Sequence, residues 1–216
     1  MINLCFHGIG TCQREREPGE ARYWVTADSF RRILDVVTGR PQVRLSFDDG
    51  NASDLEIGLP ELRERGLTAT FFALAGRLDD PASLTPAGLR ELRAAGMGIG
   101  SHGWDHIPWR DLGGAELRRE LADARSVLSE VVGAPIDEAA LPLGRYGRRL
   151  LGELKRYDYR TVYTSDRFPA REGSWLQARF SVTAGDTAET VRALVSDRPV
   201  ASDLRNRLAS AVKRLR

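Results

Sequence analysis

The sequence of 216 residues contains only two cysteines and three histidines, and it has no apolar run of about 18 residues. Its first residues lack the positively charged start, the long apolar stretch and the small-residue cleavage site of a signal peptide. No membrane span is therefore expected, and the simplest compartment is the cytoplasm. In that compartment Cys5 and Cys12 are predicted to be reduced thiols rather than a disulfide.

The sequence also lacks a large excess of charge of one sign, since it contains 32 basic and 30 acidic side chains and its net charge is +2. No dense basic run with interleaved aromatic residues occurs, so nucleic acid is not expected as a partner. The length suits a single domain over residues 1–216, because no linker, repeat or low-complexity segment divides the chain.

What the sequence does contain is a regular alternation of apolar, β-rich runs with amphipathic helical patterns. The expected strands are residues 2–6, 43–47, 69–73, 97–101, 138–141, 160–163 and 176–182. The expected helices are residues 27–37, 54–65, 86–95, 114–132, 148–156, 188–195 and 203–215. Such alternation predicts an α/β fold with a parallel sheet. Seven units without a break in composition favour a single (β/α)7 barrel, with a doubly wound open sheet as the competing architecture.

Chemically versatile side chains follow several of these strands. His7 follows the first strand, Asp48 and Asp49 follow the second, and His102 and His106 follow the fourth. Ligands bind at the C-terminal ends of parallel strands in both architectures. These residues are therefore expected to converge on one rim.

Their spacing indicates a metal. Two adjacent carboxylates at a strand end point in different directions, so one of Asp48 and Asp49 can bind a metal while the other acts as a base. His102 and His106 are four residues apart, which on a helical turn places both imidazoles on one face. Taken separately, these patterns also fit an Asp-Gly turn and a surface pair of histidines. Together, two histidines and one aspartate suit a catalytic divalent metal with open coordination positions.

Two segments also resemble motifs of the polysaccharide deacetylase family, known as the NodB-homology or carbohydrate esterase 4 group. Residues 46–50 read S-F-D-D-G, close to the family's [T/S]-F-D-D-G, and residues 101–106 read S-H-G-W-D-H, which matches S-H-[S/T/G]-x-x-H. The motifs occur in the family's order, and the resemblance extends over residues 2–182. It implies a distorted, NodB-like (β/α)7 barrel and removal of an N- or O-acetyl group from a carbohydrate.

The resemblance also assigns roles. It implies that Asp48 is the general base and that Asp49, His102 and His106 hold the metal. The family metal is usually Zn²⁺, and Co²⁺, Ni²⁺ or Mn²⁺ are also accepted.

The third family motif is altered in this chain. Residues 141–147 read L-P-L-G-R-Y-G and resemble the family's P-[F/Y]-G-x-Y version. The arginine that normally holds the base aspartate is absent from its usual position, and Arg145 and Arg179 are the two candidates to replace it. Tyr146 matches the tyrosine whose backbone N–H helps to stabilise the oxyanion.

The general acid is the second departure, because no histidine follows His106. A subgroup of the family carries [Y/F]-H on the first strand, with a circularly shifted order of motifs, and residues 6–7 resemble that pair. His7 is therefore the candidate acid, against the alternative of a packed or surface histidine. Trp104 is a candidate to stack on a sugar ring. Asp166 and Arg179 lie where family members often line the site.

These residues predict a metal-dependent hydrolase that deacetylates a carbohydrate or a sugar-containing precursor. One alternative keeps the metal and hydrolyses a non-peptide C–N bond in a small molecule. Another is a catalytically degenerate module that binds sugar, which the altered third motif and the missing C-terminal histidine favour. Asp48 argues against that module, because a pure binder needs no base beside a metal.

Overall fold

The computed structural model describes residues 1–196 and 201–215. Its main sheet is parallel and contains β1 (Ile2–Phe6), β4 (Val43–Phe47), β5 (Ala69–Ala73), β6 (Gly98–Ser101), β7 (Glu138–Ala140), β8 (Thr161–Thr164), β9 (Leu176–Ala178) and β10 (Phe180–Ser181). A second, two-stranded sheet pairs β2 (Gly8–Ile9) with β3 (Trp24–Val25).

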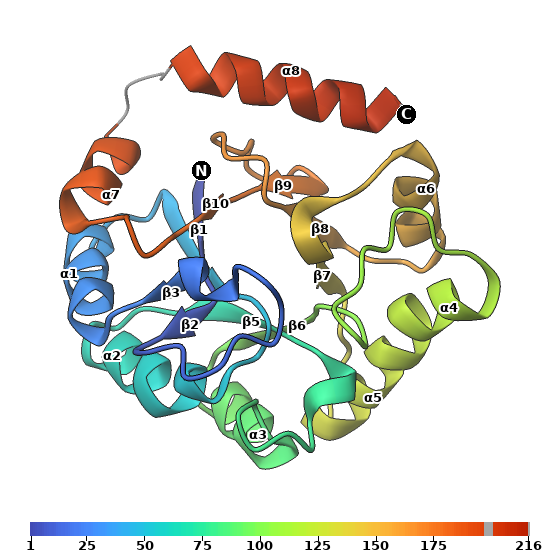
Figure 1. The fold of residues 1–216 in the computed structure, drawn as a ribbon, viewed down its shortest axis with the longest axis horizontal. Helices are drawn as coiled ribbons and strands as arrows, with labels where there is room; N and C mark the ends of the chain where they lie inside the picture. The colour runs from blue at the N-terminus through green and yellow to red at the C-terminus, as the bar shows by residue number, and fades with distance from the viewer. Residues whose placement is uncertain (197–200, 216) are drawn as a thin grey trace.

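Helices surround the main sheet (Figure 1). The α-helices are α1 (Ala27–Val37), α2 (Leu59–Glu64), α3 (Pro86–Ala94), α4 (Gly114–Arg118), α5 (Ala124–Val132), α6 (Arg148–Arg156), α7 (Ala188–Val195) and α8 (Ala201–Leu215). The shorter helical segments are η1 (Glu20–Tyr23), η2 (Asp54–Gly58), η3 (Ala75–Arg77), η4 (Arg119–Asp123) and η5 (Pro142–Gly144). Of these, η2 and η4 are π-helical and lie within the helices predicted over residues 54–65 and 114–132. No helix in the described part of the chain has the length and apolar content needed to cross a bilayer.

The sheet closes on itself at Arg179. The strand order is β10-β1-β4-β5-β6-β7-β8-β9, and β9 and β10 are consecutive in the chain with only Arg179 between them. The run predicted as one strand over residues 176–182 is therefore divided, because its first part pairs with β8 and its second part with β1. This closure confirms the (β/α)7 barrel, and the open, doubly wound sheet is wrong.

Side chains complete the seam where β9 has left β1. Asn3 Nδ2 donates to the side-chain oxygen of Gln177 at 3.1 Å and to the carbonyl of Ala178 at 3.0 Å. These bonds link β1 to β9 at the point where the two strands are not paired, and so help to close the barrel.

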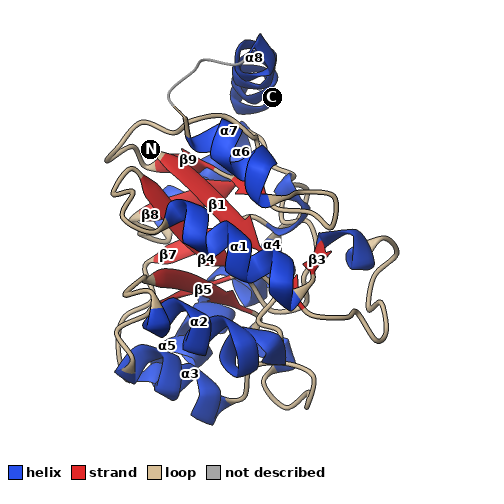
Figure 2. Cartoon of the chain, turned by 90° about the vertical axis from the view of Figure 1, so that its left-hand side faces the viewer, coloured by secondary structure: helices blue, strands red, loops and turns tan. Residues whose placement is uncertain are grey.

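Figure 2 shows helices on the outer side of the strands, and buried side chains fill both the space between these layers and the inside of the barrel. Between the strands and the helices, stacked rings such as Phe47 and Phe71, with centroids 4.6 Å apart, belong to a large buried cluster. Inside the barrel, Phe72, Ala140 and Tyr163 form a separate buried cluster. A Cβ on Gly100 would lie 2.4 Å from the ring of Phe72. Only glycine therefore leaves room for this ring inside the barrel. The packed interior puts the ligand site at the rim.

Candidate active site

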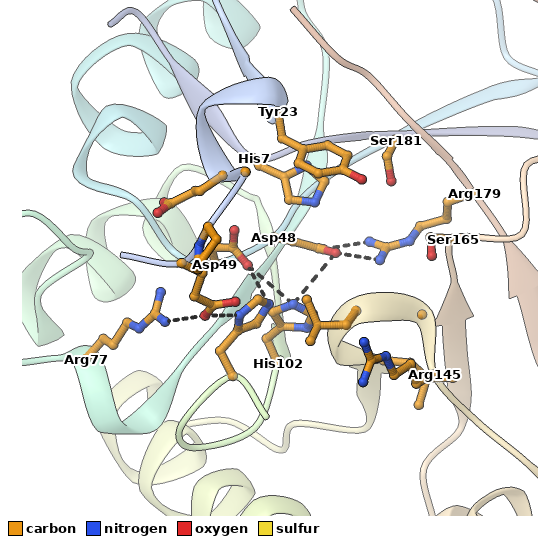
Figure 3. A pocket seen from close by; sticks show the side chains of 18 residues that line it. His7, Tyr23, Asp48, Asp49, Arg77, His102, Arg145, Ser165, Arg179 and Ser181 are labelled. Atoms are coloured by element: carbon orange, nitrogen blue, oxygen red, sulfur yellow. Dashed lines mark hydrogen bonds and ion pairs between the residues drawn. The ribbon is translucent and has the colours of Figure 1, made fainter. Parts of the chain in front are cut away.

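Seven of the ten predicted site residues meet in a pocket of about 310 Å³ at the C-terminal ends of the strands (Figure 3): His7, Asp48, Asp49, His102, His106, Arg145 and Arg179. Asp48 and Asp49 lie at the end of β4, where Asp49 has φ of 71° and Gly50 has φ of 61°. This left-handed turn directs the two carboxylates differently, and aspartate tolerates it better than most residues do. Both carboxylates are buried.

Asp49, His102 and His106 come together as a possible ligand set. Asp49 Oδ1 lies 3.4 Å from His102 Nε2 and 3.3 Å from His106 Nε2. The same oxygen is buried and has no hydrogen-bond partner among the described residues. A buried, unpaired carboxylate oxygen is costly unless a cation compensates it. One carboxylate and two imidazoles that approach one point therefore fit a divalent metal.

The far sides of both imidazoles are held in place. His102 Nδ1 lies 2.9 Å from the carbonyl oxygen of Ala140, and His106 Nδ1 contacts the carboxylate of Glu17. Because both partners only accept, each Nδ1 must carry the proton, which leaves the Nε2 lone pairs directed at Asp49. Glu17 is itself paired with Arg77 at 3.1 Å.

The loop between the two histidines is organised by Glu120, a buried residue of η4. Its carboxylate accepts from the backbone N–H of Trp104 at 2.8 Å, the backbone N–H of Asp105 at 3.1 Å and the indole N–H of Trp109 at 3.0 Å. Gly103 has φ of 89°, and a Cβ there would lie 2.2 Å from Glu120 Oε2. Three donors thus satisfy one buried carboxylate and fix the path of the loop.

Asp48 is bound by an arginine from the seam of the barrel, next to β10 and two strands away from β4. Arg179 donates from Nη1 and Nη2 to the two Asp48 oxygens at 2.7 and 2.6 Å, in the bidentate geometry of strong pairs. Arg179 Nη1 also donates to Ser46 Oγ at 3.0 Å. Burial raises the pKa of Asp48, but the charge of Arg179 and its hydrogen bonds outweigh burial, so the net shift of the pKa is downward and the carboxylate stays ionised.

The guanidinium of Arg179 rests on the barrel interior. Its central carbon lies 5.3 Å from the centre of the Phe72 ring and 5.6 Å from that of Tyr163. Aromatic faces stabilise a desolvated cation at such distances. Of the two arginines proposed from the sequence, Arg179 therefore contacts Asp48, whereas Arg145 lines the pocket with an exposed side chain.

His7 lies in the same pocket, between β1 and β2. A ring nitrogen of His7 is within 4.8 Å of an Asp48 oxygen and of Cys5 Sγ, and the ring packs against Tyr23 with centroids 4.8 Å apart. His7 Nδ1 is buried without a hydrogen-bond partner among the described residues. Burial lowers the pKa of His7 below its usual value, although the charges of Asp49 and Asp48 oppose that shift. Cys5 and Cys12 are free thiols.

Trp104 does not line the pocket. Its indole lies against Gly76, where a Cβ would approach it to 2.7 Å, and the Arg119 guanidinium lies 4.8 Å from its ring. The bare surface of Gly76 accommodates the ring on the outer side of the histidine loop. This position explains why Trp104 faces away from the pocket expected to hold a sugar.

Tyr146 and Asp166 also lie outside the pocket lining. The Tyr146 hydroxyl donates to Asp166 Oδ2 at 2.6 Å and lies 2.8 Å from Ser210 Oγ. Lys213 Nζ contacts Asp166 Oδ1 at 2.7 Å. The side chains of Tyr146 and Asp166 thus hold α8 against the barrel. The oxyanion role of the Tyr146 backbone N–H stays a prediction.

Three further pocket residues, Glu17, Tyr23 and Arg77, were not expected from the sequence. Glu17 belongs to an R-E-R-E run at residues 14–17, a pattern typical of a solvated loop. Nothing in the local pattern indicates that this loop reaches His106.

Comparisons with known proteins agree with this geometry. The polysaccharide deacetylase family model matches residues 35–162. A search of the curated proteins finds no match. Similar solved structures include the deacetylase PplD of Streptococcus pyogenes in complex with acetate, with a TM-score of 0.78, 20% identity, and coverage of 92% of this chain and 98% of that one.

Two other solved structures share the fold. IcaB from Ammonifex degensii has a TM-score of 0.75 and 21% identity, and the match covers 90% of this chain and 96% of that one. A de-N-acetylase from Aggregatibacter actinomycetemcomitans has a TM-score of 0.70 and 14% identity, with 89% and 98% covered. Because the family model spans more than half of the sequence, the chain belongs to the polysaccharide deacetylase family.

Proposed function

We propose that this protein is a metal-dependent deacetylase that hydrolyses an N- or O-acetyl group of a carbohydrate or sugar-containing precursor, and that residues 1–216 act as one catalytic domain. Family membership supports carbohydrate deacetylation. The observation that carries the metal-dependent reaction is the ionised Asp48, held by Arg179 directly beside the Asp49, His102 and His106 cluster. A module that only binds sugar would have no use for that buried carboxylate.

In this proposal Asp49, His102 and His106 hold a divalent metal, with Zn²⁺ as the first candidate for this ligand set. The bound cation would supply a Lewis acid that polarises the acetyl carbonyl and makes water more acidic. Asp48 accepts a proton from the attacking water, and Arg179 keeps its two oxygens in position. His7, which lines the same pocket, passes a proton to the leaving amine or alcohol in this proposal. The products are acetate, which the relative PplD holds in its structure, and a deacetylated sugar.

Removal of the metal should abolish acetate release from an N-acetylated chitooligosaccharide, and addition of Zn²⁺ or Co²⁺ should restore it. Metal content is measured together with acetate. The matched control is Asp49→Asn, because asparagine tolerates the positive φ of this position but binds metal poorly. Full activity in metal-free protein would contradict metal dependence. Sugar binding without acetate release by metal-loaded protein would favour the binding module.

Substitution of His7 by asparagine should lower the rate on an N-acetylated sugar by about 10²–10⁴-fold, since a general acid contributes that much to an amide reaction. The same variant should retain most activity on an aryl acetate, because a phenolate departs without a proton. Initial rates on the two substrates separate the roles. An equal loss on both would show that His7 acts on the metal site or on the fold rather than on the leaving group.

A further inference from the structure

The C-terminal helix α8 has its polar side turned inward. Ser210 is buried against Tyr146, Asn206 Nδ2 donates to the Arg167 carbonyl at 2.8 Å, and Lys213 Nζ donates to the Gly144 carbonyl at 3.3 Å. These contacts fix the rotation of the helix on the barrel. Figures 1 and 2 show α8 at the edge of the molecule, outside α6 and α7.

The opposite side of α8 is apolar and exposed. Four residues at spacings of 4, 4 and 3 form what we call the outer stripe, and they are 66%, 61%, 47% and 80% exposed: Leu204, Leu208, Val212 and Leu215. They are four of the five large hydrophobic side chains that stand exposed in the described part of the chain. Such spacing places them on one face of the helix. An amphipathic helix normally buries this face, so the outer stripe needs an occupant.

Arginines flank the outer stripe. At 3.6 residues per turn, Arg205 lies on one side of it and Arg214 on the other, whereas Arg207 turns back to the barrel, where it donates to the Pro169 carbonyl at 2.9 Å. Asp203 is the only acidic residue of α8. An apolar face bordered by cations is the pattern of helices that lie in the plane of an anionic membrane surface. We propose that α8 binds the protein peripherally to anionic lipid through the outer stripe and its arginines.

A second copy of the chain fits this surface less well. Two outer stripes packed together would bring the arginines of both copies into contact, and like charges oppose such pairing. Four side chains on one 15-residue helix also offer far less than the roughly 800 Å² per partner of a stable interface. Anionic headgroups, in contrast, complement the arginines while the leucines enter the acyl boundary. This membrane contact does not depend on the proposed deacetylation.

Flotation of the full chain with vesicles tests the proposal. Binding to phosphatidylglycerol–phosphatidylcholine vesicles should exceed binding to phosphatidylcholine alone by at least about tenfold, because each arginine near an anionic surface contributes to the affinity. The triple variant Leu204→Gln, Leu208→Gln, Leu215→Gln and the double variant Arg205→Gln, Arg214→Gln should each lose most of that binding. The matched control, Arg90→Gln with Arg93→Gln, removes two exposed arginines from α3 and should bind like the wild type.

Circular dichroism and thermal unfolding show whether each variant keeps its fold. Failure of the wild type to float with anionic vesicles would overturn the proposal, as would equal binding by the outer-stripe variant. A concentration-dependent dimer in light scattering that the leucine variant abolishes would overturn it in favour of a second copy as the occupant.

Discussion

Replacement of Arg179 by methionine should lower the free energy of unfolding by about 3–5 kcal/mol, the usual cost of leaving one partner of a buried ion pair uncompensated. The variant loses two hydrogen bonds to Asp48, one to Ser46 and the cation over two aromatic rings. Acetate release should fall with it, because Asp48 would lose both its orientation and the charge that keeps its pKa low. Chemical denaturation measures the first effect and initial rates measure the second.

Arg145→Met is the matched control. Arg145 also lines the pocket but is exposed, so its replacement should change stability by no more than about 0.5 kcal/mol. In the Arg179→Met background, Asp48→Asn should recover much of the lost stability, because no charge would then be left unpaired in the interior. If Arg145→Met lost more stability than Arg179→Met, Arg145 rather than Arg179 would be the arginine that supports Asp48.

Replacement of Asp48 by asparagine should lower kcat by about 10²–10⁴-fold, the contribution expected of a general base. Asparagine keeps the shape of the side chain but cannot take a proton from water. Metal affinity should change little, because Asp48 lies 3.9 Å from His102 Nε2, whereas Asp49 approaches both histidines more closely. Isothermal titration with Zn²⁺ and single-turnover acetate release distinguish the two effects.

Ser46→Ala is a useful comparison for Asp48→Asn, since it removes a neighbouring hydrogen-bond partner of Arg179 but no base. Its rate should remain within about tenfold of the wild type, because Arg179 keeps both of its hydrogen bonds to Asp48. If Asp48→Asn retained wild-type activity with metal bound, another group would have to accept the proton.

Much of the site could be predicted because a parallel barrel brings residues from distant parts of the sequence to one rim. Residues that follow parallel strands reach the same rim, so Asp48, Asp49, His102 and His106 could be grouped without coordinates. His7 could be placed in the same way, since it directly follows β1. These expectations required only the positions of the strands, which the periodic apolar runs indicate well.

The supporting arginine could not be chosen by the same reasoning. Arg179 lies inside a run that reads as one continuous strand, and nothing local reveals that this strand changes partners there. Its environment depends on the closure of the barrel, which brings β8 and β1 to either side of one residue. Arg145 lies within the altered motif itself and was an equal candidate from the sequence.

Two carboxylates that hold the histidine loop, Glu17 and Glu120, were missed for a related reason. Glu17 lies in a charged loop and Glu120 in the middle of a helical pattern, where both resemble solvated residues. The burial of Glu120 and the contact of Glu17 with His106 follow from long-range packing against the histidine loop. Trp104 shows the opposite error, because its position between two ligands suggested a pocket residue, whereas the small side of Gly76 accepts its ring outside the pocket.

The position of Arg179 at the seam links the order of chain synthesis to the order in which the pocket is completed. Asp49, His102 and His106 all leave the ribosome before residue 179, and so does Asp48. A nascent chain therefore has all three proposed metal ligands while Asp48, the proposed base, still lacks the partner that orients it. Docking of the last strand closes the barrel and brings Arg179 to Asp48 in the same event, so the arrangement proposed to hydrolyse an acetyl group forms only after the barrel has closed.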